Sequence, residues 1–100
     1  MSFFVSIRFN ADPKVAHDAL RQNPDLEQAI QKGIYEHGLI GCQRLVGDGE
    51  FLDIDEWPSE AVRDAFVAAA GPALKKWNQL MGNPETETHT WRSAKEDEAF

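Results

Sequence analysis

The chain has 100 residues, the size of a single domain, and 42% of them are hydrophobic and 27% charged. This composition is typical of a folded globular protein and excludes a disordered chain. The formal net charge is −7 and the ten Lys and Arg are scattered, which argues against binding to nucleic acid or to an anionic membrane surface.

No segment has the features of a secretory signal or a membrane span. The opening MSFFVSIRF has no charged leading region and no small-residue cleavage site, and Ser6 and Arg8 interrupt its apolar run. No apolar run approaches the ~20 residues that a transmembrane helix needs. Cys42 is the single cysteine and suits a reducing compartment, although a disulfide between two chains stays open. We expect a cytoplasmic protein that does not bind membranes.

The first third of the chain predicts one strand and two helical pieces. Residues 2–9 alternate as a strand with one apolar face, which is formed by Phe3, Val5, Ile7 and Phe9. Asp12-Pro13 and Asn23-Pro24 each supply an N-cap followed by a proline at the first helical position. Each pair therefore predicts the start of a helix.

The rest of the chain predicts a hairpin, a capped helix and a last strand. Residues 39–46 and 50–57 read as two strands joined by the turn GDG. Ser59 is a suitable N-cap for the helix that follows. We expect Gly71-Pro72 to interrupt this helix, because proline removes a hydrogen bond and disfavours helical geometry in the residue before it. The threonine-rich residues 85–92 alternate enough to form a strand.

The order strand, helix, strand, strand, helix, strand predicts an α+β fold of the ferredoxin-like βαββαβ type. In this fold a four-stranded antiparallel sheet carries its helices on one face. We expect residues 1–93 to form this domain and residues 94–100 to form an acidic flexible tail.

The uncovered face of the predicted sheet is not purely polar. We assign Phe4, Phe51 and Trp57 to it, in register with Arg8 and Asp55. An apolar surface left in water costs roughly 25 cal/mol per Å², so we expect this face to pack against a second copy of the chain. Such a homodimer would enclose a pocket between its two sheets.

The junction of the third strand with its helix resembles that of a known group of proteins. The sequence EWPS, with Glu56, Trp57 and Ser59, and the element order over residues 2–92 resemble the antibiotic biosynthesis monooxygenase-like proteins of the dimeric α+β barrel superfamily. The segments NPDLEQAI, HGLI and GDGEFLDIDEW resemble an uncharacterised bacterial subgroup.

The resemblance implies the fold more strongly than the reaction. The superfamily includes cofactor-independent oxygenases that act on polycyclic aromatic substrates, haem-degrading enzymes and proteins that only bind ligands. The haem-degrading branch uses an asparagine, a tryptophan and a histidine at the positions that Ile7, Phe66 and Lys76 occupy here, which argues against haem.

Polar residues of the strands are the candidates for a site in the dimer pocket. His89 is the candidate general base, because an imidazole titrates near neutral pH, and Arg8 could stabilise a developing anion. Asp53 and Asp55 could be an acid–base pair, but an ion pair with Arg8 is the commoner role of such residues. The predicted catalytic residues are His89, Arg8 and Asp55, and the predicted ligand-binding residues are Ser6, Asp53, Trp57 and Trp91.

The remaining histidines and the cysteine predict structural roles. His37 lies in the last turn of its helix, where an imidazolium favours the dipole, and His17 is expected to be exposed. Cys42 is expected to be a small buried hydrophobe, and Trp77 and Tyr35 to pack the core. No H-x-x-H, C-x-x-C or phosphate-binding glycine loop occurs, so we predict neither a metal nor an organic cofactor.

The first hypothesis for function is a cofactor-independent oxygenase that binds a small aromatic molecule in the dimer pocket. A non-catalytic ligand-binding or stress-response dimer is the second, and a plain dimerisation module with a filled interface is the third. A partly apolar cavity would favour the first two.

Overall fold

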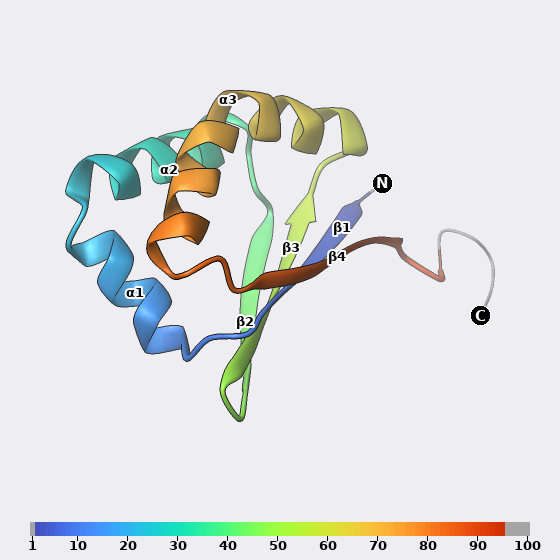
Figure 1. The fold of residues 1–100 in the computed structure, drawn as a ribbon. Helices are drawn as coiled ribbons and strands as arrows, with labels where there is room; N and C mark the ends of the chain where they lie inside the picture. Colours follow the sequence, from blue (N-terminus) through green and yellow to red (C-terminus); the bar gives the residue numbers. More distant parts are fainter. Residues whose placement is uncertain (1, 96–100) are drawn as a thin grey trace.

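Four antiparallel strands form one sheet in the order β2-β3-β1-β4 in the computed structural model, which describes residues 2–95 (Figure 1). The strands are β1 (Phe3–Phe9), β2 (Gly41–Gly47), β3 (Glu50–Trp57) and β4 (Glu85–Arg92). As expected, β1 and β3 lie at the centre and β4 flanks β1. The predicted ferredoxin-like α+β fold is thereby confirmed.

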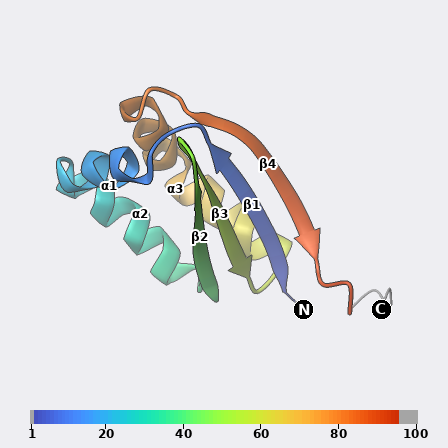
Figure 2. The same cartoon turned by 90° about the horizontal axis from the view of Figure 1, so that it is seen from below.

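Three helices cover one face of the sheet and leave the other face open (Figures 1 and 2). They are α1 (Pro13–Arg21), α2 (Pro24–Glu36) and α3 (Glu60–Leu80). Two predicted N-caps are confirmed, since Asp12 accepts a hydrogen bond from the Lys14 amide at 2.9 Å and Ser59 accepts one from the Val62 amide at 3.2 Å. The Asn23 side chain instead donates to the Ala19 carbonyl at the end of α1.

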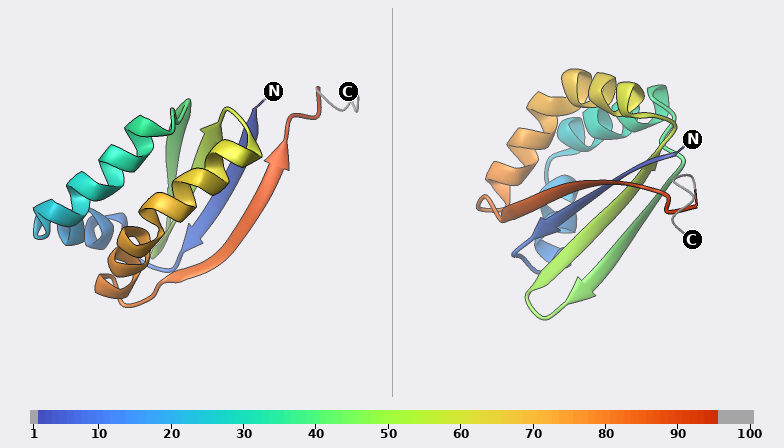
Figure 3. Two further views of the ribbon diagram at one scale, coloured as in Figure 1. Left: turned by 90° about the horizontal axis from the view of Figure 1, so that it is seen from above. Right: turned by 90° about the vertical axis from the view of Figure 1, so that its right-hand side faces the viewer.

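The predicted break at Gly71-Pro72 is wrong, because α3 runs through this dipeptide and bends there (Figures 1 and 3). Gly71 has no Cβ to clash with the proline ring, so it can stay helical before Pro72. Phe66 and Ala70 before the bend and Trp77 after it are buried. Their burial offsets the one backbone hydrogen bond that proline removes.

The core lies between the helices and the sheet, and it includes two rings that we expected on the open face. Phe51 and Trp57 are each 1% exposed beneath the helices. The Phe51 ring stacks on Phe9 with 4.6 Å between centroids, and the Trp57 ring lies 4.7 Å from that of Phe66. The predicted position of Phe51 and Trp57 is therefore wrong.

Alternation alone could not decide which face of β3 turns inward. Each of its two alternating sets contains two apolar and two acidic residues. The register decides it, because Phe9 pairs with Phe51 and Phe3 with Trp57, and the set of β1 that includes Phe3 and Phe9 packs under the helices.

Two further expectations concern single side chains. Trp77 is buried as expected, and its Nε1 donates to the Ala16 carbonyl at 3.1 Å. Tyr35 was expected in the core, but it is 89% exposed, because it lies on the outer side of α2 away from the stripe that contains Ile30 and Gly33.

Within residues 2–95, no helix is both long and apolar enough to cross a membrane. Of the tail predicted over residues 94–100, residues 96–100 lie outside the described part of the chain.

The close approach of α2 and α3 at Gly33 gives a first prediction. A Cβ on Gly33 would lie 3.0 Å from the Cβ of Ala70 and 3.1 Å from Cε1 of Phe66. We expect Gly33→Ala to lower the free energy of unfolding by about 1–3 kcal/mol in urea denaturation, because both contacts are with packed side chains. The exposed Gln28→Ala on the same helix is the control and should change it by less than about 0.5 kcal/mol. Equal stability of the two variants would contradict the close contact.

Candidate functional site

The register of the sheet divides the predicted site residues between its two faces. Ser6 pairs with His89 and Phe4 with Trp91 on the open face. Asp53, Asp55 and Trp57 lie in the other alternating set of β3, on the face that the helices cover. Because these two groups are separated by the sheet itself, they cannot act on one molecule.

The expected contact of Arg8 with Asp53 or Asp55 is wrong. Arg8 lies on the open face, where its Nη2 is 2.7 Å from Oε1 of Glu50. Its Cα partners in the neighbouring strands are Leu52 and Glu87. A strand alternates its side chains between the faces, so no rotamer brings Arg8 to the carboxylates beneath the helices.

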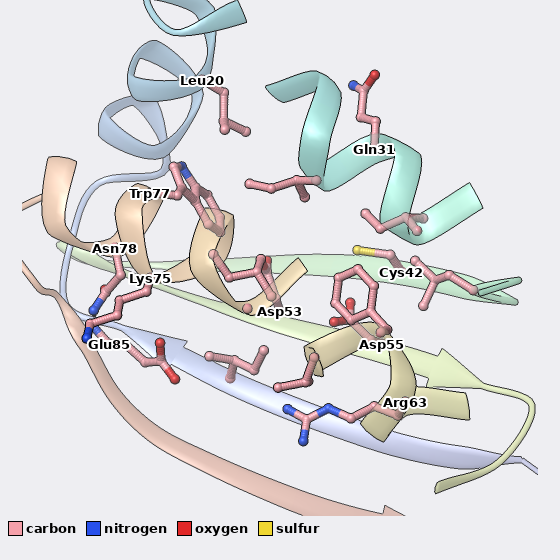
Figure 4. A pocket seen from close by; sticks show the side chains of 18 of the residues that line it. Leu20, Gln31, Cys42, Asp53, Asp55, Arg63, Lys75, Trp77, Asn78 and Glu85 are labelled. Atoms are coloured by element: carbon pink, nitrogen blue, oxygen red, sulfur yellow. The ribbon is translucent and has the colours of Figure 1, made fainter. Parts of the chain in front are cut away.

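A cavity of about 510 Å³ lies within the single chain, between the sheet and the helices α2 and α3 (Figure 4). Its wall is mostly apolar and includes Ile7, Ile34, Trp57, Phe66, Leu74 and Trp77. Its polar lining includes Cys42, Arg44, Asp53, Asp55 and Arg63. This volume and the mostly apolar wall are typical of a site for a small molecule.

Asp53 is held by an arginine from the neighbouring strand. The Arg44 guanidinium donates to both carboxylate oxygens of Asp53, at 2.6 Å from Nε and 2.9 Å from Nη2. The guanidinium also lies over the ring of Phe51, 4.5 Å from its centroid. Asp53 is buried and Arg44 neutralises its charge. The pair forms the part of the cavity wall that lies between β2 and β3.

Asp55 has no direct cationic partner within 4 Å among residues 2–95. Burial raises the pKa of its carboxyl group, and the neighbouring charge of Asp53 acts in the same direction. A hydrogen bond with Cys42 and the positive charges of Arg63 and Arg44 lower it in part. A carboxyl group with a raised pKa at the wall of an apolar cavity is a candidate acid–base group.

Cys42 lies opposite Asp55 on the edge strand β2. The residue is exposed, so the expectation of a buried hydrophobe is wrong, because β2 has no neighbour on its outer side. Its thiol faces the cavity, where burial and the negative charge of Asp55 raise its pKa to about 12. Since the thiolate is the nucleophilic form, this shift makes Cys42 a poor nucleophile at neutral pH.

The open face carries a smaller groove of about 290 Å³, whose polar side chains contact one another. The indole Nε1 of Trp91 donates to Oγ of Ser6 at 2.8 Å, and Nε2 of His89 lies 3.4 Å from a carboxylate oxygen of Glu87. The His89 side chain is 58% exposed. Ser6, Arg8, His89 and Trp91 thus share one surface, and their roles there stay predictions.

The other histidines lie away from both sites. His37 is the C-cap of α2 and its Nδ1 donates to the Gly33 carbonyl at 2.7 Å, in agreement with the expected position at the helix end. His17 is exposed on α1. In the described part of the chain, no three His, Cys, Asp or Glu side chains gather closely enough to hold a metal ion.

Arg44 and Arg63 were missed as site residues. The hairpin contained a signal for Arg44, because a turn at GDG pairs Gly47 with Glu50 and therefore Arg44 with Asp53. No sequence signal places Arg63 at the cavity, since this depends on how α3 lies over the sheet.

No model of a known protein family matches the chain, and no curated protein matches it by sequence. Solved structures do share its fold. A conserved protein of Methanosarcina mazei is 16% identical with a TM-score of 0.65, and the alignment covers 93% of each chain. A cofactor-independent oxygenase of Streptomyces nogalater is 12% identical with a TM-score of 0.62, covering 92% of this chain and 91% of that one.

A third structure, of an antibiotic biosynthesis monooxygenase, is 16% identical with a TM-score of 0.54 and covers 91% of this chain and 94% of the other. The chain therefore has the fold that the strand-to-helix junction led us to expect. At these identities the likeness extends to the fold alone.

The ion pair of Arg44 and Asp53 gives a second prediction. We expect Asp53→Ala to cost about 1.5–3 kcal/mol in the free energy of unfolding, because it leaves a half-buried guanidinium without its carboxylate. Arg44→Ala should cost a similar amount, and the double variant less than the sum by at least about 1 kcal/mol. The exposed pair Lys32–Glu36 is the control cycle, with a coupling below about 0.5 kcal/mol. If the changes in the free energy of unfolding for Arg44→Ala and Asp53→Ala simply add in the double variant, the ion pair does not stabilise the fold.

Proposed function

We propose that this chain is a cofactor-independent oxygenase that binds a small aromatic molecule in the cavity between its sheet and helices. One observation carries the proposal: Asp55 presents a carboxyl group of raised pKa to an apolar cavity of about 510 Å³. The shared fold with a cofactor-independent oxygenase supports it.

Asp55 acts as the general base in the proposed reaction. A raised pKa makes the carboxylate a stronger base than an aspartate in water. It removes a proton from an activated CH₂ group or a hydroxyl group of the substrate, as in an anthrone or a hydroquinone. At a CH₂ group the overall change is CH₂ + O₂ → C=O + H₂O. One oxygen atom enters the substrate, the other leaves as water, and the four electrons come from the substrate carbon.

The cavity contributes orientation and exclusion of water. Its apolar wall, which includes Trp57, Phe66 and Trp77, suits a flat aromatic ring. A substrate anion held there reacts with dioxygen directly, so the protein needs to supply only desolvation, position and the base.

His89 is the weaker candidate for the base. It lies on the far side of the sheet from the cavity, and its ring already contacts Glu87 and the indole of Trp91. A reaction that uses His89 and Arg8 would need a substrate on the open face, covered by a second chain. The two sites therefore predict opposite effects on turnover when Asp55 or His89 is replaced.

The third prediction separates the two candidate bases by turnover. We expect Asp55→Asn to lower oxygen consumption with an accepted anthrone or hydroquinone by about 10²–10⁴-fold, because the amide cannot accept the proton. His89→Ala should leave it within about twofold. Turnover that survives Asp55→Asn but is lost with His89→Ala would move the reaction to the open face.

The fourth prediction is that the same variant gains stability. Burial raises the pKa of Asp55 in the folded chain. Between the ordinary pKa of an aspartate and this raised pKa, the folded state therefore binds more protons than the unfolded state, and stability falls as pH rises. The ionised carboxylate therefore costs stability at neutral pH. We expect Asp55→Asn to raise the urea midpoint at pH 7, and the gain to vanish as pH falls below the ordinary range of aspartate. A lower urea midpoint of Asp55→Asn at pH 7 would contradict the expected gain in stability. A loss of turnover in this variant could then result from misfolding.

In the proposed active form, a second copy of the chain covers the open face. This face contains the half-buried Phe4, Leu52 and Ile54 and the exposed Leu45 and Trp91. Burying them on an equal surface would remove apolar area from water at roughly 25 cal/mol per Å².

The fifth prediction concerns this assembly. Light scattering should give twice the mass of the 11.2 kDa chain, and Ile54→Lys should weaken association by roughly 100-fold or more because it places a charge in the interface. Val15→Lys on the exposed side of α1 is the control and should leave the mass unchanged. A single-chain mass at micromolar concentration would remove the dimer from the proposal.

A dimer that binds a ligand without turnover is the second candidate function. It is favoured by the absence of histidine from the cavity lining among residues 2–95 and by the protonated state of Cys42. Tight binding of an aromatic ligand with no oxygen consumption would support it. The cavity argues against a plain dimerisation module.

A further inference from the structure

Three side chains form one polar end of the cavity. Cys42 and Asp55 reach it from the sheet and Arg63 reaches it from α3, while Lys75, Asn78 and Glu85 lie at the other end (Figure 4). Between the two ends the wall is mostly apolar, apart from Asp53, whose carboxylate is bonded to Arg44. A molecule in the cavity therefore meets a defined set of polar groups at each end.

Arg63 is paired differently from Arg8 and Arg44 of the sheet. Arg8 and Arg44 each contact a carboxylate directly, at 2.7 Å and 2.6 Å. Among the described residues, no carboxylate lies within 4 Å of Arg63, although its charge acts on Asp55. Arg63 and Asp55 thus attract each other without a direct bond at one end of the cavity.

We infer that the cavity selects ligands with an acidic hydroxyl group, such as the enol of a 1,3-dicarbonyl or a hydroxyquinone, whose oxygen lies between Asp55 and Arg63. This substrate class rests on the proposed cavity site, but it does not require turnover. In the bound state one proton and one negative charge are shared by the ligand oxygen and Asp55. The guanidinium balances that charge.

This class of ligand follows from a comparison of two acidities, that of the ligand's hydroxyl group and that of the Asp55 carboxyl group. An ordinary phenol has a pKa near 10 and an ordinary carboxylic acid a pKa near 4, so the proton would favour the phenol by about a million-fold. Burial raises the pKa of Asp55 and so narrows this difference, but a carboxyl group is still a stronger acid than an ordinary phenol. A hydroxyl group with the acidity of an enol or a hydroxyquinone shares its proton with Asp55 at far smaller cost, and Arg63 stabilises the resulting oxyanion.

The test compares two ring systems that differ in one group. We would measure binding of 2-hydroxy-1,4-naphthoquinone and of its methyl ether, 2-methoxy-1,4-naphthoquinone, by calorimetry at pH 7. The hydroxy compound should bind at least tenfold tighter. Arg63→Met should weaken the hydroxy compound at least tenfold and leave the ether within about twofold. Lys76→Met, which removes the same charge from α3 at a residue outside the cavity lining, should change neither.

Proton uptake gives a readout that a purely structural role of Asp55 would not produce. The hydroxyquinone is ionised at pH 7, so its binding should take up about one proton in the wild type and none in Asp55→Asn. Equal affinity for the two compounds, or equal weakening of both by Arg63→Met, would overturn the inference. Binding of neither compound would overturn it together with the cavity as a ligand site. Selective binding of the hydroxyquinone by a chain that consumes no oxygen with an anthrone or a hydroquinone would support it and contradict only the oxygenase.

Discussion

The burial of Phe51 and Trp57 beneath the helices is the constraint on which the candidate site depends. Side chains of a strand alternate between its faces, so a strand with these two rings inward must also turn Asp53 and Asp55 inward. Placing two carboxylates under the helices is costly unless they are paired or neutralised. The chain meets this cost for Asp53 with Arg44 and leaves Asp55 with a raised pKa. The chemistry of the cavity is thus a consequence of how the core is packed.

The two faces of the sheet differ in how completely their polar groups are satisfied. On the open face, Arg8 contacts Glu50, and Trp91 donates to Ser6. On the covered face, Asp55 and Arg63 lie at one end of a cavity without a direct bond. Polar groups that are already bonded favour a surface that another chain can cover, because they bring few unpaired charges into an interface. Polar groups held apart beside apolar walls favour a ligand.

Local signals in the sequence predicted the elements well, and long-range packing explains what they missed. The caps at Asp12 and Ser59 and the strand order followed from residue types and spacing. The face of β3 did not, because both of its alternating sets mix two apolar and two acidic residues and only the pairing with β1 distinguishes them. The continuity of α3 through Pro72 depends on burial before and after the bend, which no local rule contains. Arg63 joined the site for a similar reason, since its position depends on how α3 lies over the sheet.

The protonated thiol of Cys42 has a practical consequence for spectroscopy. With a pKa of about 12, Cys42 carries very little thiolate at pH 7, so maleimide and iodoacetamide dyes would modify it slowly. A cysteine introduced at an exposed position of the helices would react far faster. Fluorophores or spin probes could then be attached at a chosen point while the native residue stays in place beside Asp55.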